Sequence, residues 1–290
     1  MNVELIKQQL EANPNDPEAR WKHGCLLAFS GRWEEAWPEL EWRFKGHRPT
    51  ITKRAFYPRP NWDGSNCRVL IYQEQGFGDL FQYVRYIHEL KCPYILHVQP
   101  EVYNLLKYQN FNVVMIGDPL PEYDQVCGSC SLPYHFKRII APQFYLQAPK
   151  TNFKLEGKIG IAWAGNPDFY DDGHRSCDPS EFLPLSECGE LVSLMIKKTS
   201  YPFTDLSMKI RDFADTAEII DQLDCVVTVD TAVAHLAGAL GKTVHLALSY
   251  KHDWRWQTGE TTPWYPTFKL YRQSEEGNWK SVFNNIKEVL

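Results

Sequence analysis

Short apolar runs alternate along most of the chain with stretches whose apolar residues recur three or four positions apart. Runs such as 68–72 and 94–98 are continuous, which is the pattern of a strand that is buried on both faces. The stretch 80–91 between them has the spacing of a helix with one apolar face. Because strand and helix keep alternating, the pattern predicts an α/β fold with parallel sheets and right-handed crossovers.

The alternation stops after residue 127 and restarts near residue 158, which predicts two consecutive α/β units. The expected strands are 68–72, 94–98, 112–116, 123–127, 158–163, 191–197, 225–229 and 243–248. Ligand sites in such units lie at the carboxyl ends of the strands. If those ends face each other, the site is a cleft between the units. A last helix, about 278–290, is expected to brace the first unit.

Residues 1–45 lack strand patterns and read as helices. Pro17 follows Asn15 and Asp16 at a helix start, and Gly24 is a small residue where two helices could touch. The spacing resembles a tetratricopeptide repeat, although a plain helical hairpin is the alternative. Since roughly three repeats are needed for a free-standing array, this piece must pack on the rest of the chain.

Composition narrows the class of protein. The chain is 43% hydrophobic with a net charge of −5, a composition that excludes large-scale disorder. The sequence has no basic stripe, which argues against a nucleic-acid-binding protein. No apolar run approaches the roughly 20 residues of a membrane span, and the N-terminus lacks a signal-peptide layout, so we expect a cytoplasmic protein. Cys127 and Cys130 form a CxxC pair with His135 nearby, but no fourth ligand is evident. We therefore expect neither metal nor other cofactor.

The first candidate loop, 75–79, follows the first strand and contains Gly76 and Gly78 before Asp79. Glycines let the backbone approach a ligand, and the helix start offers free N–H groups to an anion. The loop lacks both the P-loop lysine and the three-glycine dinucleotide fingerprint, which disfavours an NAD-dependent enzyme. Asp79 is either a functional carboxylate or a helix cap in a capping box with Gln82.

The second candidate loop follows the strand 225–229 and opens a helix that a glycine ends. Small residues, Thr231 and Ala232, leave the first helical turn open to a diphosphate, which the helix dipole favours. His235 lies one turn further and could donate a hydrogen bond to a phosphate. In the structural alternative, Asp230 is an N-cap and His235 is a packed histidine.

Several segments, taken in order, carry a family resemblance. They are "EQGFGDLFQYVRYI", "SLP", "KIGIAWAGNP", "VTVDTAVAHLAGALGK", "DWRW" and "PWYPTFKLYRQ". From about Trp62 onward the chain resembles the glycosyltransferase-like region of bacterial tetratricopeptide-repeat proteins, which is similar to the heptosyltransferases of glycosyltransferase family 9 and, more distantly, to the O-GlcNAc transferases. The resemblance implies a GT-B fold, with two Rossmann-like domains facing a cleft. It also implies inverting, metal-independent transfer from a nucleotide sugar to a saccharide or protein acceptor.

The resemblance implies a division into a helical extension and linker (1–57), an acceptor-side domain (58–152) and a donor-side domain (153–290). It places Asp79 as the general base and the segment 230–235 at the donor phosphate. Glu74 is a second candidate for the base, chosen because a helix cap does not engage it.

The remaining candidates for the donor site lie after the strand 158–163. Gly165 and Asn166 would line this site, together with Gly76 and Gly78 of the first loop. Arg175 would stabilise the leaving diphosphate, or else pair with the neighbouring aspartates. The rival hypothesis is a catalytically inactive binding or scaffold protein that keeps the fold.

Overall fold

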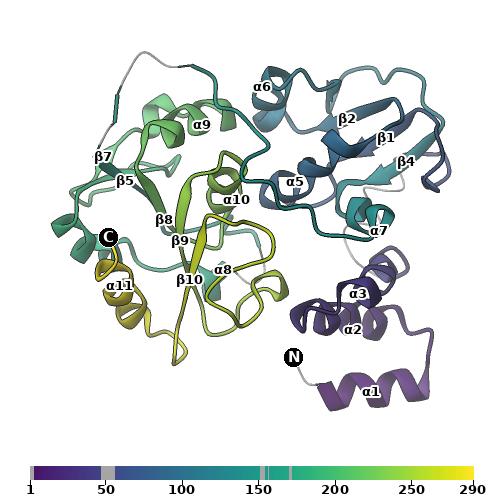
Figure 1. Ribbon diagram of the computed structural model, residues 1–290, viewed down its shortest axis with the longest axis horizontal. Helices are drawn as coiled ribbons and strands as arrows, with labels where there is room; N and C mark the ends of the chain where they lie inside the picture. Colours follow the sequence, from purple (N-terminus) through teal and green to yellow (C-terminus); the bar gives the residue numbers. More distant parts are fainter. Residues whose placement is uncertain (1–2, 47–55, 151–153, 156, 170–171) are drawn as a thin grey trace.

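The structure, a computed structural model, describes residues 3–46, 56–150, 154–155, 157–169 and 172–290. Two all-parallel sheets lie side by side, each with helices packed around it, and the N-terminal helices lie against their junction (Figure 1). This confirms the α/β class and the parallel sheets. The predicted boundary at 152/153 lies outside the described residues.

The first sheet has the strand order β3-β2-β1-β4. Its strands are β1 (Val69–Tyr72), β2 (Tyr94–Val98), β3 (Val113–Met115) and β4 (Gln125–Gly128). Its helical segments are α5 (Phe77–Tyr83), η2 (Val84–Glu89), α6 (Pro100–Tyr108), η3 (Ser129–Ser131) and α7 (Leu132–Phe136). The order reverses between β1 and β4, so their carboxyl ends form the crevice where such sheets bind ligands.

The second sheet has the strand order β10-β9-β8-β5-β6-β7. Its strands are β5 (Lys158–Ala162), β6 (Glu190–Ser193), β7 (Thr204–Asp205), β8 (Cys225–Val229), β9 (Thr243–Leu248) and β10 (Phe268–Arg272). Its helical segments are α8 (Asp172–Arg175), η4 (Pro179–Glu187), η5 (Ser207–Lys209), α9 (Phe213–Gln222), α10 (Ala232–Ala239), η6 (Trp254–Trp256) and α11 (Trp279–Lys287). If these six strands are renumbered 1 to 6 in chain order, the sheet has the doubly wound order 3-2-1-4-5-6. The strand order reverses between β5 and β8, which is the switch point of this sheet.

Some predicted elements differ from those observed. The helix after the first strand begins at Phe77 and gives way to 3-10 turns at Val84, so it is shorter than the predicted 80–91. The prediction that the last helix braces the first unit is wrong. Helix α11 packs on η4, β9 and β10, where Trp279 and Phe283 complete a core on one side of the second sheet.

The N-terminal helices are α1 (Val3–Ala12), α2 (Pro17–Phe29) and α3 (Trp33–Leu40), followed by η1 (Glu41–Phe44). Gly24 lies where α2 meets α3, since a methyl group there would come within 2.9 Å of Cβ of Glu39. Trp33 has ring contacts with both Trp254 and Trp264 of the second unit. The prediction that this piece packs on the rest of the chain is therefore confirmed, whereas its identity as a tetratricopeptide repeat stays a prediction.

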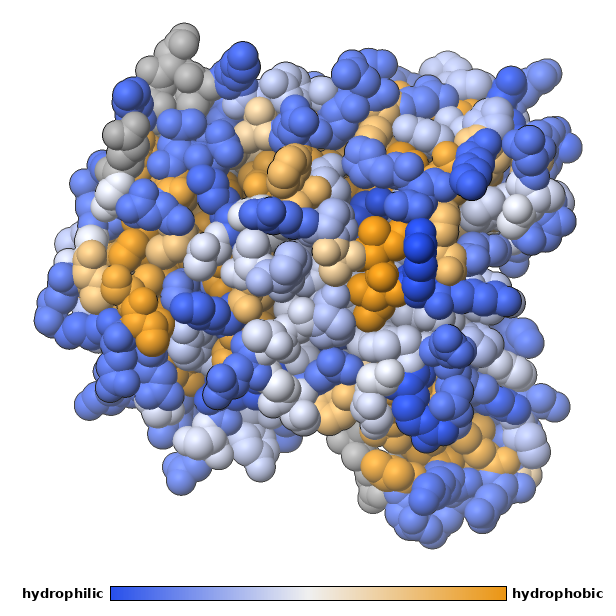
Figure 2. All heavy atoms as spheres, in the orientation of Figure 1, coloured by the Kyte–Doolittle hydropathy of each residue, from blue (hydrophilic) through white to orange (hydrophobic). Residues whose placement is uncertain are grey.

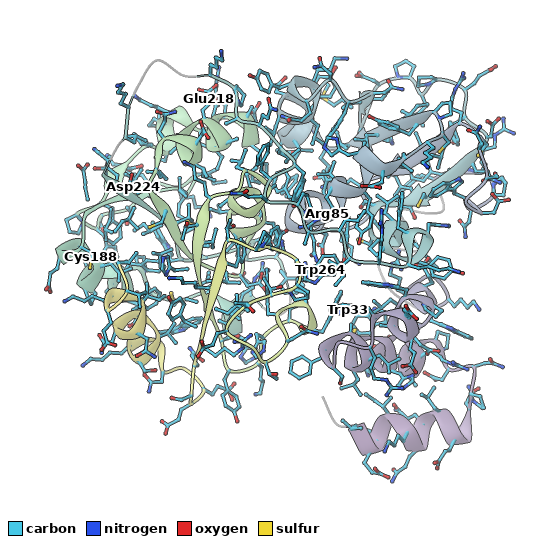
Figure 3. All side chains as sticks on the ribbon, in the orientation of Figure 1. Trp33, Arg85, Cys188, Glu218, Asp224 and Trp264 are labelled. Carbon is cyan, nitrogen blue, oxygen red and sulfur yellow. The ribbon has the colours of Figure 1, made fainter. Side chains whose placement is uncertain are left out.

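Buried polar contacts join the two units. Arg85 of the first unit donates to the backbone oxygen of Trp264 in the second, and Trp33 lies close to the same junction (Figure 3). On the face shown in Figure 2, polar residues cover most of the surface and apolar residues form separate groups. Within the described ranges, every helix is too short or too polar to cross a bilayer.

Candidate functional site

The loop 75–79 of the first unit contacts the start of helix α10 in the second. A methyl group added at Gly78 would lie 2.8 Å from Cδ2 of His235 and 3.5 Å from Cα of Ala232. Only a glycine permits this approach of α5 to α10, because any Cβ would collide with the imidazole. The structure therefore brings together two loops that lie about 150 residues apart in the sequence.

Asp79 lies at the third position of α5 rather than at its cap. Its Oδ2 accepts a hydrogen bond from the backbone N–H of Gly76, the N-cap residue, at 3.1 Å. The proposed capping box with Gln82 is wrong, because Gln82 is fully buried and its Oε1 accepts from Arg255. One carboxylate oxygen of Asp79 thus holds the glycine turn, and the other faces the second unit.

That second oxygen is paired with Arg255, a residue that the sequence interpretation did not single out. Nη2 of Arg255 donates to Oδ1 of Asp79 at 2.9 Å, and Nε donates to Oδ1 of Asp253 at 2.9 Å. Burial lowers the pKa of Arg255, but the carboxylates of Asp253 and Asp79 raise it more, so it lies well above its usual value. The available signal was a lone cation between two tryptophans in "DWRW".

Asp230 follows β8 and is not the N-cap of α10, a position that Thr231 occupies. Its Oδ2 accepts from Nε1 of Trp256 at 2.8 Å, and its Oδ1 lies 3.8 Å from Nε2 of His235. Burial raises the pKa of Asp230, while the nearby guanidinium of Arg255 lowers it. Three carboxylates, those of Asp79, Asp230 and Asp253, therefore surround one guanidinium.

His235 is a packed histidine in this structure. Its side chain is 3% exposed, its Nδ1 lies 2.8 Å from the hydroxyl of Tyr265, and its ring stacks on Trp256. Burial and then the nearby charge of Arg255 hold its pKa well below the usual value, so the imidazole is neutral. The structural alternative thus describes His235 better than the phosphate-donor hypothesis does, because the ring faces protein on all the sides described.

Gly165 and Arg175 lie together beyond the carboxyl end of β5. Gly165 donates its N–H to the hydroxyl of Ser176 at 3.1 Å, and a Cβ on it would lie 2.3 Å from Nη2 of Arg175. Arg175 donates from Nε to Oδ1 of Asp172 at 2.9 Å, so the predicted pairing with an aspartate is present. Asn166 is exposed in the same loop.

The reasoning that favoured Glu74 as a base is wrong. Its side chain is 0% exposed, and Arg43 of η1 grips it with both Nε and Nη2, the latter at 2.8 Å. Arg43 also donates to the hydroxyl of Ser131 at 2.6 Å. A carboxylate that is buried and paired in this way is not available to an acceptor hydroxyl. No local pattern pointed to this partner, because it comes from the N-terminal helices, 31 positions away.

Comparisons with known proteins give structural likeness only. No protein-family model matches the chain, and no curated protein matches it. The fold is similar to that of E. coli heptosyltransferase WaaC with ADP-2-deoxy-2-fluoro heptose, at 12% identity and a TM-score of 0.49, over 77% of this chain and all of that one. Because the identity is only 12% and the TM-score is 0.49, this similarity does not establish the function of the chain.

Two further similar structures are of TibC, described as a dodecameric, iron-containing glycosyltransferase from enterotoxigenic E. coli and as a heptosyltransferase in complex with ADP-D-beta-D-heptose. Their identities are 12% and 13%, and their TM-scores 0.49 and 0.47, over 77% of this chain and 66% and 67% of theirs. These descriptions contradict the expectation that no metal takes part, and metal independence is withdrawn. Within the described ranges, no group of three or more His, Cys, Asp or Glu side chains is arranged to hold a metal ion.

Proposed function

We propose that this chain is a glycosyltransferase that moves a sugar from a nucleotide-sugar donor to an acceptor hydroxyl. The single observation that carries the proposal is the pair of Asp79 and Arg255, which joins a carboxylate of the first unit to η6 of the second. A carboxylate can take the proton from the acceptor, and the neighbouring helix start can bind the leaving diphosphate. Both groups lie in one place, as sugar transfer requires.

In this proposal the molecule is a GT-B-like protein, with residues 58–152 on the acceptor side and 153–290 on the donor side. The donor phosphates lie at the start of α10, near Thr231 and Ala232, where the helix dipole and backbone N–H groups favour negative charge. Arg175 reaches the same carboxyl-end face of the sheet from α8. We keep Asp79 as the base and assign the packed His235 to the floor of the site.

The pairing of Arg255 with Asp79 implies that the donor binds before Asp79 takes a proton. Nη2 of Arg255 donates to Oδ1 of Asp79, so this oxygen must be released before it can accept a proton. A donor diphosphate bound beside α10 would compete for the same guanidinium, because phosphate oxygens are strong partners of arginine. Donor binding would therefore loosen Asp79 and leave it free to take the acceptor proton.

The test begins with binding. A panel of UDP, GDP, ADP and CMP sugars at millimolar concentration, with and without added metal, should include one that raises the melting temperature. A ligand present at about 100 times its Kd stabilises the native state by about 2.7 kcal/mol. If no member of the panel shifts the melting temperature, nucleotide-sugar binding is refuted.

The second step measures release of free nucleotide with the donor so found. Asp79→Asn should lower turnover by roughly 100-fold or more, since an amide does not take the acceptor proton, and should keep or tighten donor binding, because Arg255 loses a competing carboxylate. Asp118→Asn, an exposed aspartate elsewhere on the first unit, is the matched control and should match the wild type.

The rival, a binding module without turnover, has one observation in its favour. Both carboxylate oxygens of Asp79 are already engaged, by the N–H of Gly76 and by Arg255. That rival predicts stabilisation by a nucleotide sugar together with equal background release in the wild type and Asp79→Asn. The two outcomes do not overlap, so the same experiment decides between them.

A further inference from the structure

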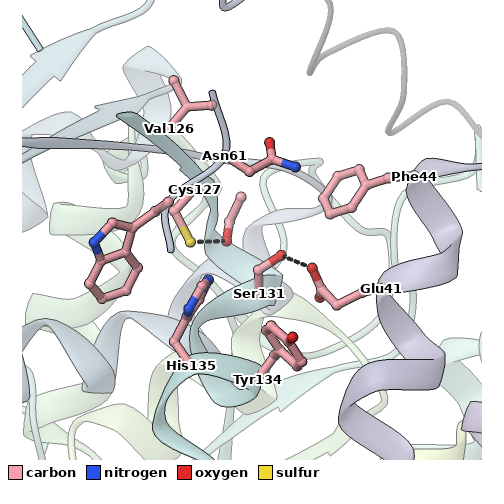
Figure 4. A pocket seen from close by; sticks show the side chains of 10 residues that line it. Glu41, Phe44, Asn61, Val126, Cys127, Ser131, Tyr134 and His135 are labelled. Carbon is pink, nitrogen blue, oxygen red and sulfur yellow. Dashed lines mark hydrogen bonds between the residues drawn. The ribbon is translucent and has the colours of Figure 1, made fainter. Parts of the chain in front are cut away.

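A cavity of about 150 Å³ lies at the outer edge of the first sheet, beside the carboxyl end of β4 and away from the two loops discussed above. It is bounded by η1, by residues 61–62, by the carboxyl end of β4 and by α7 (Figure 4). The loop 75–79 and the start of α10 do not line it. The cavity therefore lies on the edge of β4 that faces away from β1, where Asn61 pairs with Val126.

The polar side of the cavity is built around Glu41 and His135. Oε2 of Glu41 accepts from the hydroxyl of Ser131 at 2.9 Å, and Oε1 accepts from Nη1 of Arg43 at 2.5 Å, so the carboxylate is both fixed and neutralised. Burial lowers the pKa of His135 to about 4, so its imidazole is neutral and presents one donor and one acceptor nitrogen.

Aromatic rings lie beside these polar groups in the lining. The ring of Trp62 lies 4.5 Å from that of His135, centroid to centroid, and Phe44 lies beside Glu41 on η1 (Figure 4). Tyr134 is 38% exposed, so it lies at the mouth rather than in the core. A ligand that enters here meets apolar ring faces next to hydrogen-bonding groups.

Charge and size limit which ligand fits. Among the described residues that line the cavity, none offers a free cation to an anion, because the neighbouring side chain of Arg43 is 4% exposed and already bonded to Glu41, Glu74 and Ser131. A cation gains little, because Glu41 is already neutralised. Among the described residues, no set of side chains is placed to bind a metal ion. At roughly 30 Å³ per water, the volume corresponds to about five waters, so it admits no more than one ring, part of which would remain outside the mouth.

We propose that this cavity binds one neutral sugar ring, whose C–H face packs on the aromatic side chains while its hydroxyls bond to Glu41 and His135. Hydroxyl groups both donate and accept, which matches a carboxylate beside a neutral imidazole. The inference goes beyond the proposed function and does not depend on it, because the cavity shares no residue with the donor loops or with Asp79.

The test is saturation-transfer NMR on the full chain with the methyl glycosides of glucose, galactose, mannose and N-acetylglucosamine. Choline and methyl phosphate, both of which carry observable methyl protons, represent the cationic and anionic classes. At least one glycoside should receive saturation in the wild type. Its affinity should fall roughly threefold to tenfold in Tyr134→Ala, since that change removes an aromatic contact. His135→Ala should weaken binding similarly, through lost hydrogen bonds.

Tyr108→Ala is the matched control, since Tyr108 is a 43% exposed tyrosine at the end of α6 and should bind as the wild type does. Asp79→Asn should also bind normally, which separates this site from the proposed catalytic one. Three outcomes overturn the inference: no transfer to any glycoside, equal affinity in Tyr134→Ala and Tyr108→Ala, or transfer to choline or methyl phosphate that Tyr134→Ala abolishes.

Discussion

Removing Arg43 should destabilise the protein far more than removing a surface arginine. Arg43 and Glu74 are 4% and 0% exposed in their side chains and are joined by two hydrogen bonds. The substitution Arg43→Met keeps the length of the side chain and removes its charge. It leaves the Glu74 carboxylate buried without a cation, in a place that water does not reach.

The size of the effect follows from that burial. Breaking a buried pair by removing one partner costs about 3–5 kcal/mol, because the remaining charge is left uncompensated. Each kcal/mol lowers the melting temperature by roughly 2–4 °C in chains of about this size, so the expected drop is roughly 6–20 °C. In the double variant Arg43→Met/Glu74→Met the buried Glu74 charge is gone and only the 25% exposed Glu41 loses a cation, so the melting temperature should recover most of the loss.

The assay is a thermal melt at pH 7, followed by near-ultraviolet circular dichroism, which reports on the packed tryptophans. Arg32→Met is the matched control. It removes an arginine of the same N-terminal segment, whose pair with Glu35 is 57% exposed on both sides, so solvent screens the pair and its loss should change the melting temperature little. Equal melting temperatures for Arg43→Met and Arg32→Met would refute the reasoning, as would a double variant less stable than Arg43→Met.

Three further changes test other parts of the structure. Gly78→Ala should lower the free energy of unfolding, measured in urea, by about 1–3 kcal/mol, because the new methyl group would clash with His235. Gly173→Ala is the control and should leave this free energy nearly unchanged, because the space around its new methyl group is open. Equal effects of the two substitutions would contradict the packing of Gly78 against His235. Burial lowers the pKa of His245 to about 4 from 6.5, so only the unfolded chain takes up a proton between these values and stability falls as the pH drops from 6.5 to 4. His245→Phe should flatten that slope in pH-dependent melts, and an unchanged slope would argue against this histidine. Trp33→Ala should lower the free energy of unfolding by about 2–4 kcal/mol and should speed proteolysis of the N-terminal helices, because it removes their contacts with Trp254 and Trp264. An unchanged rate of cleavage would show that these contacts do not hold the N-terminal helices in place.

Local pattern was enough to predict most of the sheets. The runs at 94–98, 225–229 and 243–248 coincide with β2, β8 and β9, because strands buried on both faces are continuously apolar. Two strands were missed. β7 has two residues, and β10 reads Phe-Lys-Leu-Tyr-Arg, an alternating edge strand in a segment interpreted for its aromatic residues.

The site was predicted less completely than the fold. The segments 75–79 and 230–235 were identified from glycines and small residues after strands, which is local information. The partners that define their state are distant in sequence: Arg255 lies 176 positions from Asp79, and Arg43 lies 31 from Glu74. No periodicity encodes such pairs, since they depend on how the units pack. The same limit explains why His235 could be interpreted either as a ligand or as a packed residue.

The N-terminal helices are best understood as part of the first unit's ligand-binding edge. The carboxyl ends of β1 and β4 would form an open crevice in an isolated sheet, yet Arg43 fills it and bonds to Glu74 and Ser131 there. The same helices contribute Glu41 to the remaining cavity and reach the second unit through Trp33. A segment that neutralises a buried carboxylate, lines a cavity and contacts both units determines what the first sheet can bind. The sequence pattern predicted a helical extension. Its charged residues also make it part of the lining of the proposed sugar cavity, and its tryptophan contacts hold it against the second unit.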